Sequence, residues 1–240
     1  MTILDWLVSH YDWQAGLVFL LLLIAMTWIV KYFVFKVPAL ERERLKNMAL
    51  WKEKRKLEKY PPVMRATQKT GMRCNVVFVF FLSPFLLTLE AQPLWEILLD
   101  LVVVLMVYDF MYYLTHRFVF HGQGAFRKIH AVHHQARDPS YIDAHYVHPL
   151  ETLVGLLLFL GTFPLVGFWL GPLHSVSAAL AFLVFTQLNQ INHCKIELPY
   201  FPFKTLSWIA ARHAAHHENM HKGNYATITL LYDKLFGTYC

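Results

Sequence analysis

The chain has 240 residues, of which 56% are hydrophobic and 14 are histidine, and its formal net charge is +6. A composition this apolar excludes an ordinary soluble domain, which carries more charge. The three cysteines, Cys74, Cys194 and Cys240, have no paired or CxxC spacing. This spacing argues against a disulfide framework and against thiolate metal binding.

Long apolar runs follow one another along the chain and predict membrane-spanning helices. Residues 16–35 reach the roughly 20 residues that a helix needs to cross a bilayer. Residues 94–115, 150–170 and 173–192 are comparable, and residues 75–89 form a shorter run. The sequence therefore predicts an all-α integral membrane helix bundle with four or five transmembrane helices, folded as one structural domain.

Positive charge is concentrated in residues 36–73, where 12 Lys and Arg stand against 4 Glu. Beside a predicted span, such a stretch is typical of a cytoplasmic loop rather than of a nucleic-acid site. We expect residues 38–59 to form a helical segment at the membrane surface. No Lys or Arg precedes Lys31, so a cleaved signal peptide is not expected. Residues 1–93 thus hold the first span, the basic loop and the start of a hairpin.

The predicted spans bring most of the histidines to one side of the membrane. Two hairpins, which turn at residues 91–93 and 171–172, both return the chain to the cytoplasm. Twelve of the 14 histidines then lie on the cytoplasmic side, and only His10 and His174 lie elsewhere. Residues 94–240 are therefore predicted to form the functional region, with a histidine-rich helical cap on the cytoplasmic side.

The same HxxHH spacing occurs twice, in residues 130–134 and in residues 213–217. Positions i, i+3 and i+4 share one face of a helix, so each copy is expected to present three imidazoles in one direction. His116 and His121 stand five apart. Their rings face one centre only if the helix ends or bulges between them.

Imidazole is the commonest nitrogen ligand for metals and suits iron, zinc and copper. His193 joins the motif histidines as a candidate because it shares a helix face with Asn189 at the end of the last span. Nine such nitrogens exceed one tetrahedral zinc site and suit two metal ions of higher coordination number. The predicted metal ligands are His116, His121, His130, His133, His134, His193, His213, His216 and His217.

Other polar residues are predicted to ligate or to support these ligands. An acidic residue inside a span is costly, so Asp109 and Glu151 are expected to accept hydrogen bonds from ligand rings. His148 and Asn189 are second-rank ligand candidates. His145 and His221 are candidates for either role, and Asp138, Asp143 and Asp233 are candidates for support from loops. Asp100 is expected either to support a ligand ring or to pack against a neighbouring helix. No catalytic residue beyond the metal centre is predicted.

These motifs resemble those of the membrane-bound fatty acid hydroxylase/sterol desaturase superfamily. The segment HRFVFH at 116–121 is similar to the first histidine box of its fatty acid 2-hydroxylase branch, whereas many sterol-acting members have one residue fewer there. Residues 130–151, which end in HPLE, are similar to the second box. Residues 213–239 are similar to the third box and tail of sterol C4-methyl oxidases and C5-desaturases. The resemblance covers roughly residues 100–239.

The resemblance implies a non-haem centre of two iron ions at the cytoplasmic face, for which zinc can substitute in a purified sample. It also implies O2-dependent hydroxylation, desaturation or methyl oxidation of a lipid. The chain lacks GxGxxG, CxxCH and ferredoxin CxxC patterns, so electrons are expected from a separate ferredoxin or cytochrome. The expected location is a bacterial inner membrane, with the endoplasmic reticulum as the alternative.

Two other functional classes fit the same residues. A zinc-dependent lipid hydrolase or isomerase would use the histidines without O2 or electrons. A metal transporter would place ionisable residues along a path at mid-bilayer, whereas here the histidines gather at one predicted end. The sequence leaves open whether the lipid is a sterol, a fatty acyl chain or another apolar molecule.

Overall fold

The computed structural model describes residues 2–201 and 203–240. Its regular structure is almost entirely helical, which confirms the predicted all-α fold. In chain order the elements are α1 (Ile3–His10), α2 (Trp13–Lys36), α3 (Pro38–Arg55), α4 (Tyr60–Val77), η1 (Phe78–Leu82), α5 (Ser83–Leu86), β1 (Leu87–Thr88), α6 (Leu94–Leu114), η2 (Thr115–Phe120), α7 (Ala125–His130), η3 (His133–Gln135), η4 (Tyr141–His145), α8 (Pro149–Leu170), β2 (Leu173–His174), α9 (Ser175–Ile191), α10 (Phe203–Glu218) and α11 (Leu231–Leu235).

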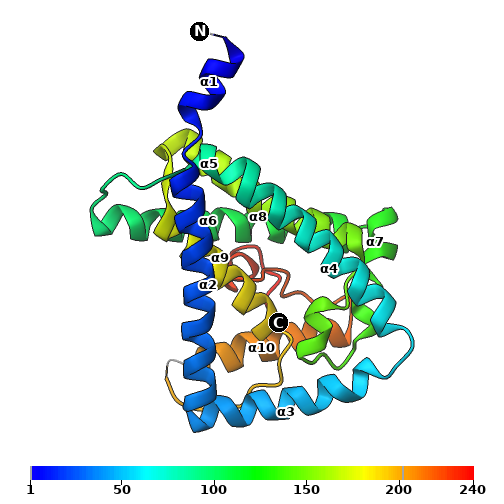
Figure 1. Ribbon diagram of the computed structural model, residues 1–240. Coiled ribbons are helices and arrows are strands. Elements are labelled where there is room, and N and C mark those ends of the chain that lie inside the picture. Colours follow the sequence, from blue (N-terminus) through cyan, green and yellow to red (C-terminus); the bar gives the residue numbers. More distant parts are fainter. Residues whose placement is uncertain (1, 202) are drawn as a thin grey trace.

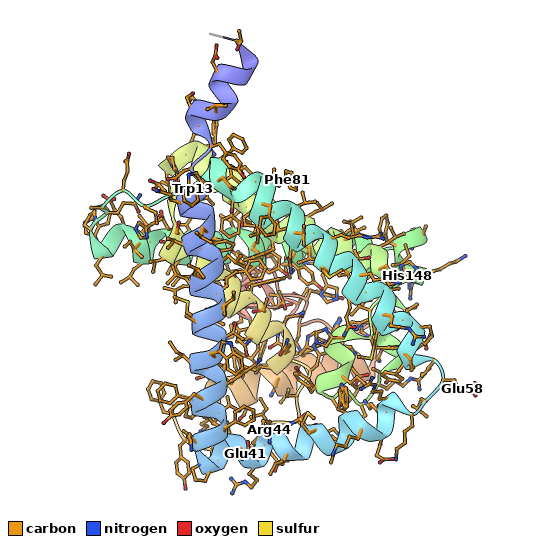
Figure 2. The ribbon with its side chains drawn as sticks, in the orientation of Figure 1. Trp13, Glu41, Arg44, Glu58, Phe81 and His148 are labelled. Carbon is orange, nitrogen blue, oxygen red and sulfur yellow. The ribbon has the colours of Figure 1, made fainter. Side chains whose placement is uncertain are left out.

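The first long helices form a frame around the rest of the chain. In Figure 1, α2 runs down one side, α3 crosses the end and α4 returns. The Asp12 side chain caps α2 by accepting a backbone N–H three residues on, at 2.9 Å. Pro38 occupies the first turn of α3, where its missing N–H costs nothing. Figure 2 places Trp13 and Phe81 near one end of this frame and Arg44 near the other.

Helix α4 continues through the π-helical turn η1 into α5, so the backbone stays helical from Tyr60 to Leu86. The apolar run predicted at 75–89 is therefore the end of a longer helix that begins in polar sequence. Strand β1 follows and pairs with β2 in parallel, Leu87 opposite Leu173. This pairing brings the two predicted hairpin turns to the same end of the molecule.

The core lies where five helices meet. Helix α2 packs along α9, α4 packs along α8, and α6 packs against both α8 and α9. Aromatic side chains fill the contact: the rings of Phe159 and Phe185 stack with centroids 4.1 Å apart, and Tyr108 meets both edge to face. The helices that carry the histidines thus emerge from a rigid, apolar bundle.

Three of the described helical segments are long and apolar enough to cross a membrane: Trp13–Lys36, Leu94–Phe120 and Pro149–Leu170. Ser175–Ile191 is also apolar, but it has 17 residues and falls short of the length for a simple span. The structure therefore supports an integral membrane protein. The predicted number of four or five spans stays a prediction.

Helices α3 and α4 of the frame hold the loop segments around Asp143 and Lys195 through side-chain contacts. The Asp143 carboxylate of η4 pairs with Lys54 of α3 and accepts from the Tyr60 hydroxyl at 2.7 Å. The Asn47 side chain accepts the Lys195 N–H at 3.1 Å and donates to the Lys195 carbonyl at 3.2 Å. The helix expected within residues 38–59 is present as α3, and the rest of the basic segment belongs to α4. The two helices close one side of the histidine-rich region.

Candidate metal centre

Short, irregular elements carry the first histidine pair to its position. The segment η2 is π-helical, and the His121 N–H bonds to the His116 carbonyl five residues back, at 2.9 Å. This widened turn lets both rings face one centre, with centroids 4.9 Å apart. The bulge that the sequence required is therefore present.

The nine predicted ligands gather into two groups of nitrogens. Within each group, the atoms that could hold a metal all lie within 4.8 Å of one another. In the first group, the His130 Nε2 lies 3.0 to 3.1 Å from three other Nε2 atoms. In the second, successive Nε2 atoms are 3.0 to 3.2 Å apart. The first group is His116, His121, His130, His134 and His216, and the second is His133, His193, His213 and His217.

Each HxxHH motif contributes to both groups, which differs from the expectation that its three imidazoles share one direction. The outer pair, His130 and His134, belongs to the first group, while His133 belongs to the second. In the other copy the outer pair belongs to the second group and His216 to the first. The reason is angular: positions i and i+4 lie close together on a helix, whereas i+3 lies on the other side of i.

Backbone carbonyls fix the direction of six rings. Since a carbonyl can only accept, the Nδ1 that faces it carries the hydrogen, and the Nε2 keeps its lone pair. His116 donates to the Tyr225 carbonyl at 2.7 Å, and His121 donates to the Met220 carbonyl at 2.7 Å. The other four donors to carbonyls are His133, His193, His216 and His217.

Lone pairs that converge at about 3 Å repel one another unless a cation lies between them. The His133 and His193 Nε2 atoms, for example, are 3.0 Å apart, and both are acceptors. Nitrogens bound about 2.0 to 2.1 Å from one ion lie roughly 3.0 to 3.4 Å from their neighbours. The His216 Nε2 is also buried without any partner. The donor set therefore fits one metal ion in each group.

The rings are held in the neutral form that binds metals. Burial lowers the pKa of His121, His130 and His216 to about 3. Burial also lowers the pKa of His133, His193 and His217. Protons therefore do not compete with a metal for these nitrogens near pH 7.

A cavity of about 590 Å³ joins the histidines to the apolar helices. It lies between α4 on one side and α6, α8 and α9 on the other, and its inner end includes His116, His133 and His213. Met72 of α4 and Phe80 of η1 line the cavity and are also exposed at the surface. An apolar molecule can therefore reach the histidines along α4.

Comparison with known proteins agrees with this geometry. The family model described as Fatty acid hydroxylase matches residues 101–238, which include all nine clustered histidines. The chain belongs to the fatty acid hydroxylase family. Its expected resemblance to the wider superfamily is thereby confirmed. No solved structure matches the chain.

Curated relatives in the family carry several activities in their names. Methylsterol monooxygenase 1 of Rattus norvegicus is 33% identical over 159 residues, which cover 62% of this chain and 50% of that protein. A Cholesterol 25-hydroxylase-like protein of Danio rerio is 29% identical over 174 residues, 68% of this chain and 67% of its own. A Very-long-chain aldehyde decarbonylase of Oryza sativa is 29% identical over 205 residues, 75% of this chain and 65% of its own. The chain spans about half the length of several curated relatives.

Glu151 lies where the sequence places it, against a ligand candidate. Its Oε1 is 2.7 Å from the His130 Nδ1, and both side chains are buried. A carboxylate in this position orients the ring and makes its other nitrogen more basic toward a metal. Glu151 is thus the Nδ1 acceptor for His130, whereas backbone carbonyls are the Nδ1 acceptors for six other rings.

Asp109 does not accept from a histidine, contrary to expectation. Its carboxylate accepts the backbone N–H groups of Thr227, Ile228 and Thr229 at 2.8 to 3.0 Å, and also the Thr229 hydroxyl. These residues fill the space between its helix face and the rings. Asp109 therefore supports the histidines indirectly: it holds the segment that contains Tyr225, and the Tyr225 carbonyl orients His116.

The other acidic candidates also serve the scaffold. Asp233 accepts the backbone N–H groups of Tyr225 and Ala226, both at 2.8 Å, and so secures the same segment. Asp143 binds α3 and α4, and Asp138 pairs with Lys195 at 2.6 Å. Asp100 lies beside His174, on the part of α6 away from the cluster. The sequence named these carboxylates as supports for ligand rings but could not show which groups they would bind instead.

Four further candidates stand outside the two groups. The His148 Nδ1 accepts the Leu150 N–H at 3.2 Å and caps α8. His145 lines the cavity, and His221 is exposed. Asn189 contributes its backbone carbonyl to His193. The orienting carbonyls of Tyr225, Met220 and Gly223 had no sequence signal, because every residue carries one.

Proposed function

We propose that the chain is a membrane-bound di-iron oxidoreductase that uses O2 to hydroxylate, oxidise or desaturate a C–H bond of a lipid. The observation that carries the proposal is the pair of buried, all-histidine groups at the inner end of an apolar cavity. Membership of the fatty acid hydroxylase family supports the same reaction class. Names of relatives such as Methylsterol monooxygenase 1 favour oxygen chemistry over hydrolysis.

The first group would hold one iron through five histidines and the second would hold another through four. When bound, iron supplies the redox chemistry that a C–H bond without acidic or electrophilic character requires. The chain's own part is to fix the rings. Carbonyls hold the Nδ1–H groups of six rings and Glu151 holds that of His130, so that seven of the nine Nε2 lone pairs are directed inward.

The lipid would enter from the bilayer along α4. The cavity is lined there by apolar side chains that are also exposed at the surface, including Met72 and Val76. Its inner end presents His116 and His213 to whichever carbon reaches them. Apolar walls keep bulk water away from the reacting carbon, and they accept a fatty acyl chain or a sterol-like molecule equally.

The proposed setting is a membrane with the metal centre on the cytoplasmic side. Net positive charge on α3 and α4 supports this orientation through the positive-inside rule. A bacterial inner membrane and the endoplasmic reticulum are the two candidate locations. Electrons would come from a separate ferredoxin or cytochrome, and no part of the proposal involves nucleic acid.

Substituting one histidine from each group tests the proposal. We expect His133→Ala and His216→Ala each to lower bound iron and to abolish lipid oxidation, since each removes a ligand from one ion. The measurement is iron content by mass spectrometry, together with 18-O incorporation into lipid from 18-O2. The matched control is His174→Asn, which removes an imidazole at the opposite end of the bundle but keeps an acceptor for the start of α9.

The rival functions predict different outcomes of the same assay. A zinc-dependent hydrolase or isomerase would lose activity in both variants without consuming O2 in the parent protein. A metal transporter would move metal across vesicles and would need no lipid substrate. Full lipid oxidation in both histidine variants would remove the di-iron assignment.

A further inference from the structure

A second cavity, of about 560 Å³, reaches the histidines from another side. It shares no lining residue with the apolar cavity. His134 and His217 form part of its wall, beside Gln135 and the turn that follows α10. The metal centre therefore has two separate approaches.

This second approach leads to the place where the two histidine groups meet most closely. The rings of His134, from the first group, and His217, from the second, stack with centroids 4.8 Å apart and planes at 25°. Other ring contacts between the groups span 5.7 to 6.1 Å among the described residues. The His134 Nδ1 is buried and has no partner. A molecule in the second cavity thus adjoins both groups at once.

The wall of the second cavity is polar, unlike that of the first. Apart from Ala131 and Met220, every lining residue carries a polar or charged side chain. A lipid chain would gain little there, because burial in such a cavity removes little apolar surface from water. The occupant is therefore expected to be polar.

The rim of this cavity carries uncompensated positive charge. Lys59 and Arg137 form no ion pair with any described residue, and both are exposed. Lys59 is held in place by the Gln135 side chain at 3.5 Å and by the Tyr146 ring at 5.5 Å. The acidic lining residue, Glu218, is paired with Lys222 at 3.3 Å. The net field at the rim favours a negatively charged partner.

We infer that the second cavity is the docking site of an acidic one-electron carrier protein, a site that rests on the proposed oxidoreductase function. Each hydroxylation combines R–H, O2, two electrons and two protons into R–OH and water. The two electrons come from outside the lipid. Because the carrier delivers one electron at a time, it must dock twice for each turnover. Docking at Lys59 and Arg137 brings its surface against His134 and His217, beside both groups, while the lipid occupies the other cavity.

A binding experiment tests this site without relying on turnover. The probe is an acidic plant-type ferredoxin, titrated calorimetrically into the iron-loaded protein in nanodiscs. We expect binding that weakens with salt, and a Kd raised roughly tenfold or more in Lys59→Glu/Arg137→Glu. The matched control, Lys52→Glu/Lys204→Glu, makes the same change in net charge at two other exposed lysines and should bind as the parent does. A basic cytochrome c of similar size should bind more weakly than the ferredoxin.

Turnover then separates docking from general damage. With ferredoxin as donor, Lys59→Glu/Arg137→Glu should show a raised KM for ferredoxin and an unchanged iron content. With a small uncharged reductant, it should match the parent, because no protein needs to dock. Equal ferredoxin binding by this variant and the parent would overturn the site. The site would also be overturned if Lys59→Glu/Arg137→Glu weakened binding to anionic lipid vesicles but left ferredoxin binding unchanged. Ferredoxin binding without lipid oxidation would leave the site standing and would remove the proposed function instead.

Discussion

At the scale of single residues, the centre depends on which nitrogen of each imidazole carries the proton. In six rings a backbone carbonyl accepts from the Nδ1 and so fixes the proton there, as the Tyr225 carbonyl does for His116. For His130 the position of the proton is set by Glu151, the one carboxyl group bound to these rings among the described residues. His130 is also central to its group, with three Nε2 neighbours near 3 Å. The Glu151 contact should therefore affect metal affinity more than any single carbonyl contact does.

We predict that Glu151→Gln weakens iron binding by about 10- to 100-fold. The glutamine oxygen can still accept from the His130 Nδ1. A neutral amide, however, makes the ring a poorer donor to the metal than a carboxylate does. Glu151→Ala should weaken binding at least as much, since the ring loses its acceptor. The measurement is a competition titration against a chelator of known iron affinity. The control is Glu90→Gln, at an exposed position near the opposite end of the bundle. Parent-like affinity in both Glu151 variants would refute the role.

The sequence singled out all nine clustered histidines. The dense HxxHH pattern marked six of them, and position at the ends of predicted spans marked His116, His121 and His193. Their division between two groups was not predicted, although both motifs divide in the same way: the i and i+4 rings share one group and the i+3 ring joins the other. Only the second motif lies wholly in an α-helix, since His133 and His134 lie in a 3-10 turn. Ligation by these residues stays a prediction until metal is measured.

At the scale of elements, α6 supports the centre through a segment that is distant in sequence. Asp109 faces inward from the middle of an apolar helix, and three consecutive backbone N–H groups, from Thr227 to Thr229, satisfy its carboxylate. A buried carboxylate requires such partners, because without them its desolvation would be prohibitive. This arrangement fixes the segment from Tyr225 to Thr229 beside η2, where it orients His116.

We predict that Asp109→Asn lowers the free energy of unfolding by about 1.5 to 3 kcal/mol, the usual value of a hydrogen bond to a charged group. The new amide would turn its own N–H toward backbone N–H donors. Thermal unfolding in detergent measures the loss, and iron content should fall with it as the Tyr225 carbonyl moves. Asp100→Asn, on the same helix but away from the histidines, is the comparison. Parent-like stability of Asp109→Asn would mean that the segment is held by other contacts.

The elements were predictable to different degrees for physical reasons. The bulge at η2 followed from the five-residue spacing of His116 and His121, since a regular helix could not bring both rings together. The partner of Asp109 did not follow, because residues 225–229 form no helix or strand and are held in place by α6 itself. Local patterns encode helices, but they do not encode which loop crosses which helix face.

At the scale of the whole molecule, apolar runs predicted the bundle, while long-range packing determines the cavity. The runs marked α2, α6, α8 and α9 within a few residues. They did not show that the helical backbone continues from α4 through η1 to Leu86, or that α4 lines the path to the histidines together with α6, α8 and α9. That path exists only because helices far apart in sequence leave space between them.

A glycine in the cavity wall offers a test of this path that leaves the metal untouched. Gly71 of α4 lines the cavity, and a Cβ added there would meet only the Leu156 side chain, at 3.9 Å. We predict that Gly71→Leu folds normally but fills the space that a long lipid needs. Oxidation of the natural lipid should then fall by roughly tenfold or more, since about 1.4 kcal/mol of lost binding has that effect.

The matched control is Gly161→Leu, a helical glycine of α8 outside the cavity, where an added Cβ would meet nothing within 4 Å. Both substitutions replace a helical glycine by leucine, so both gain similar helix propensity. Iron content should be unchanged in each, and only Gly71→Leu should slow lipid oxidation. A shorter substrate analogue should recover part of that loss, because the blocked path restricts size and not chemistry. Equal turnover of the long lipid by both variants would mean that the substrate reaches the histidines by another route.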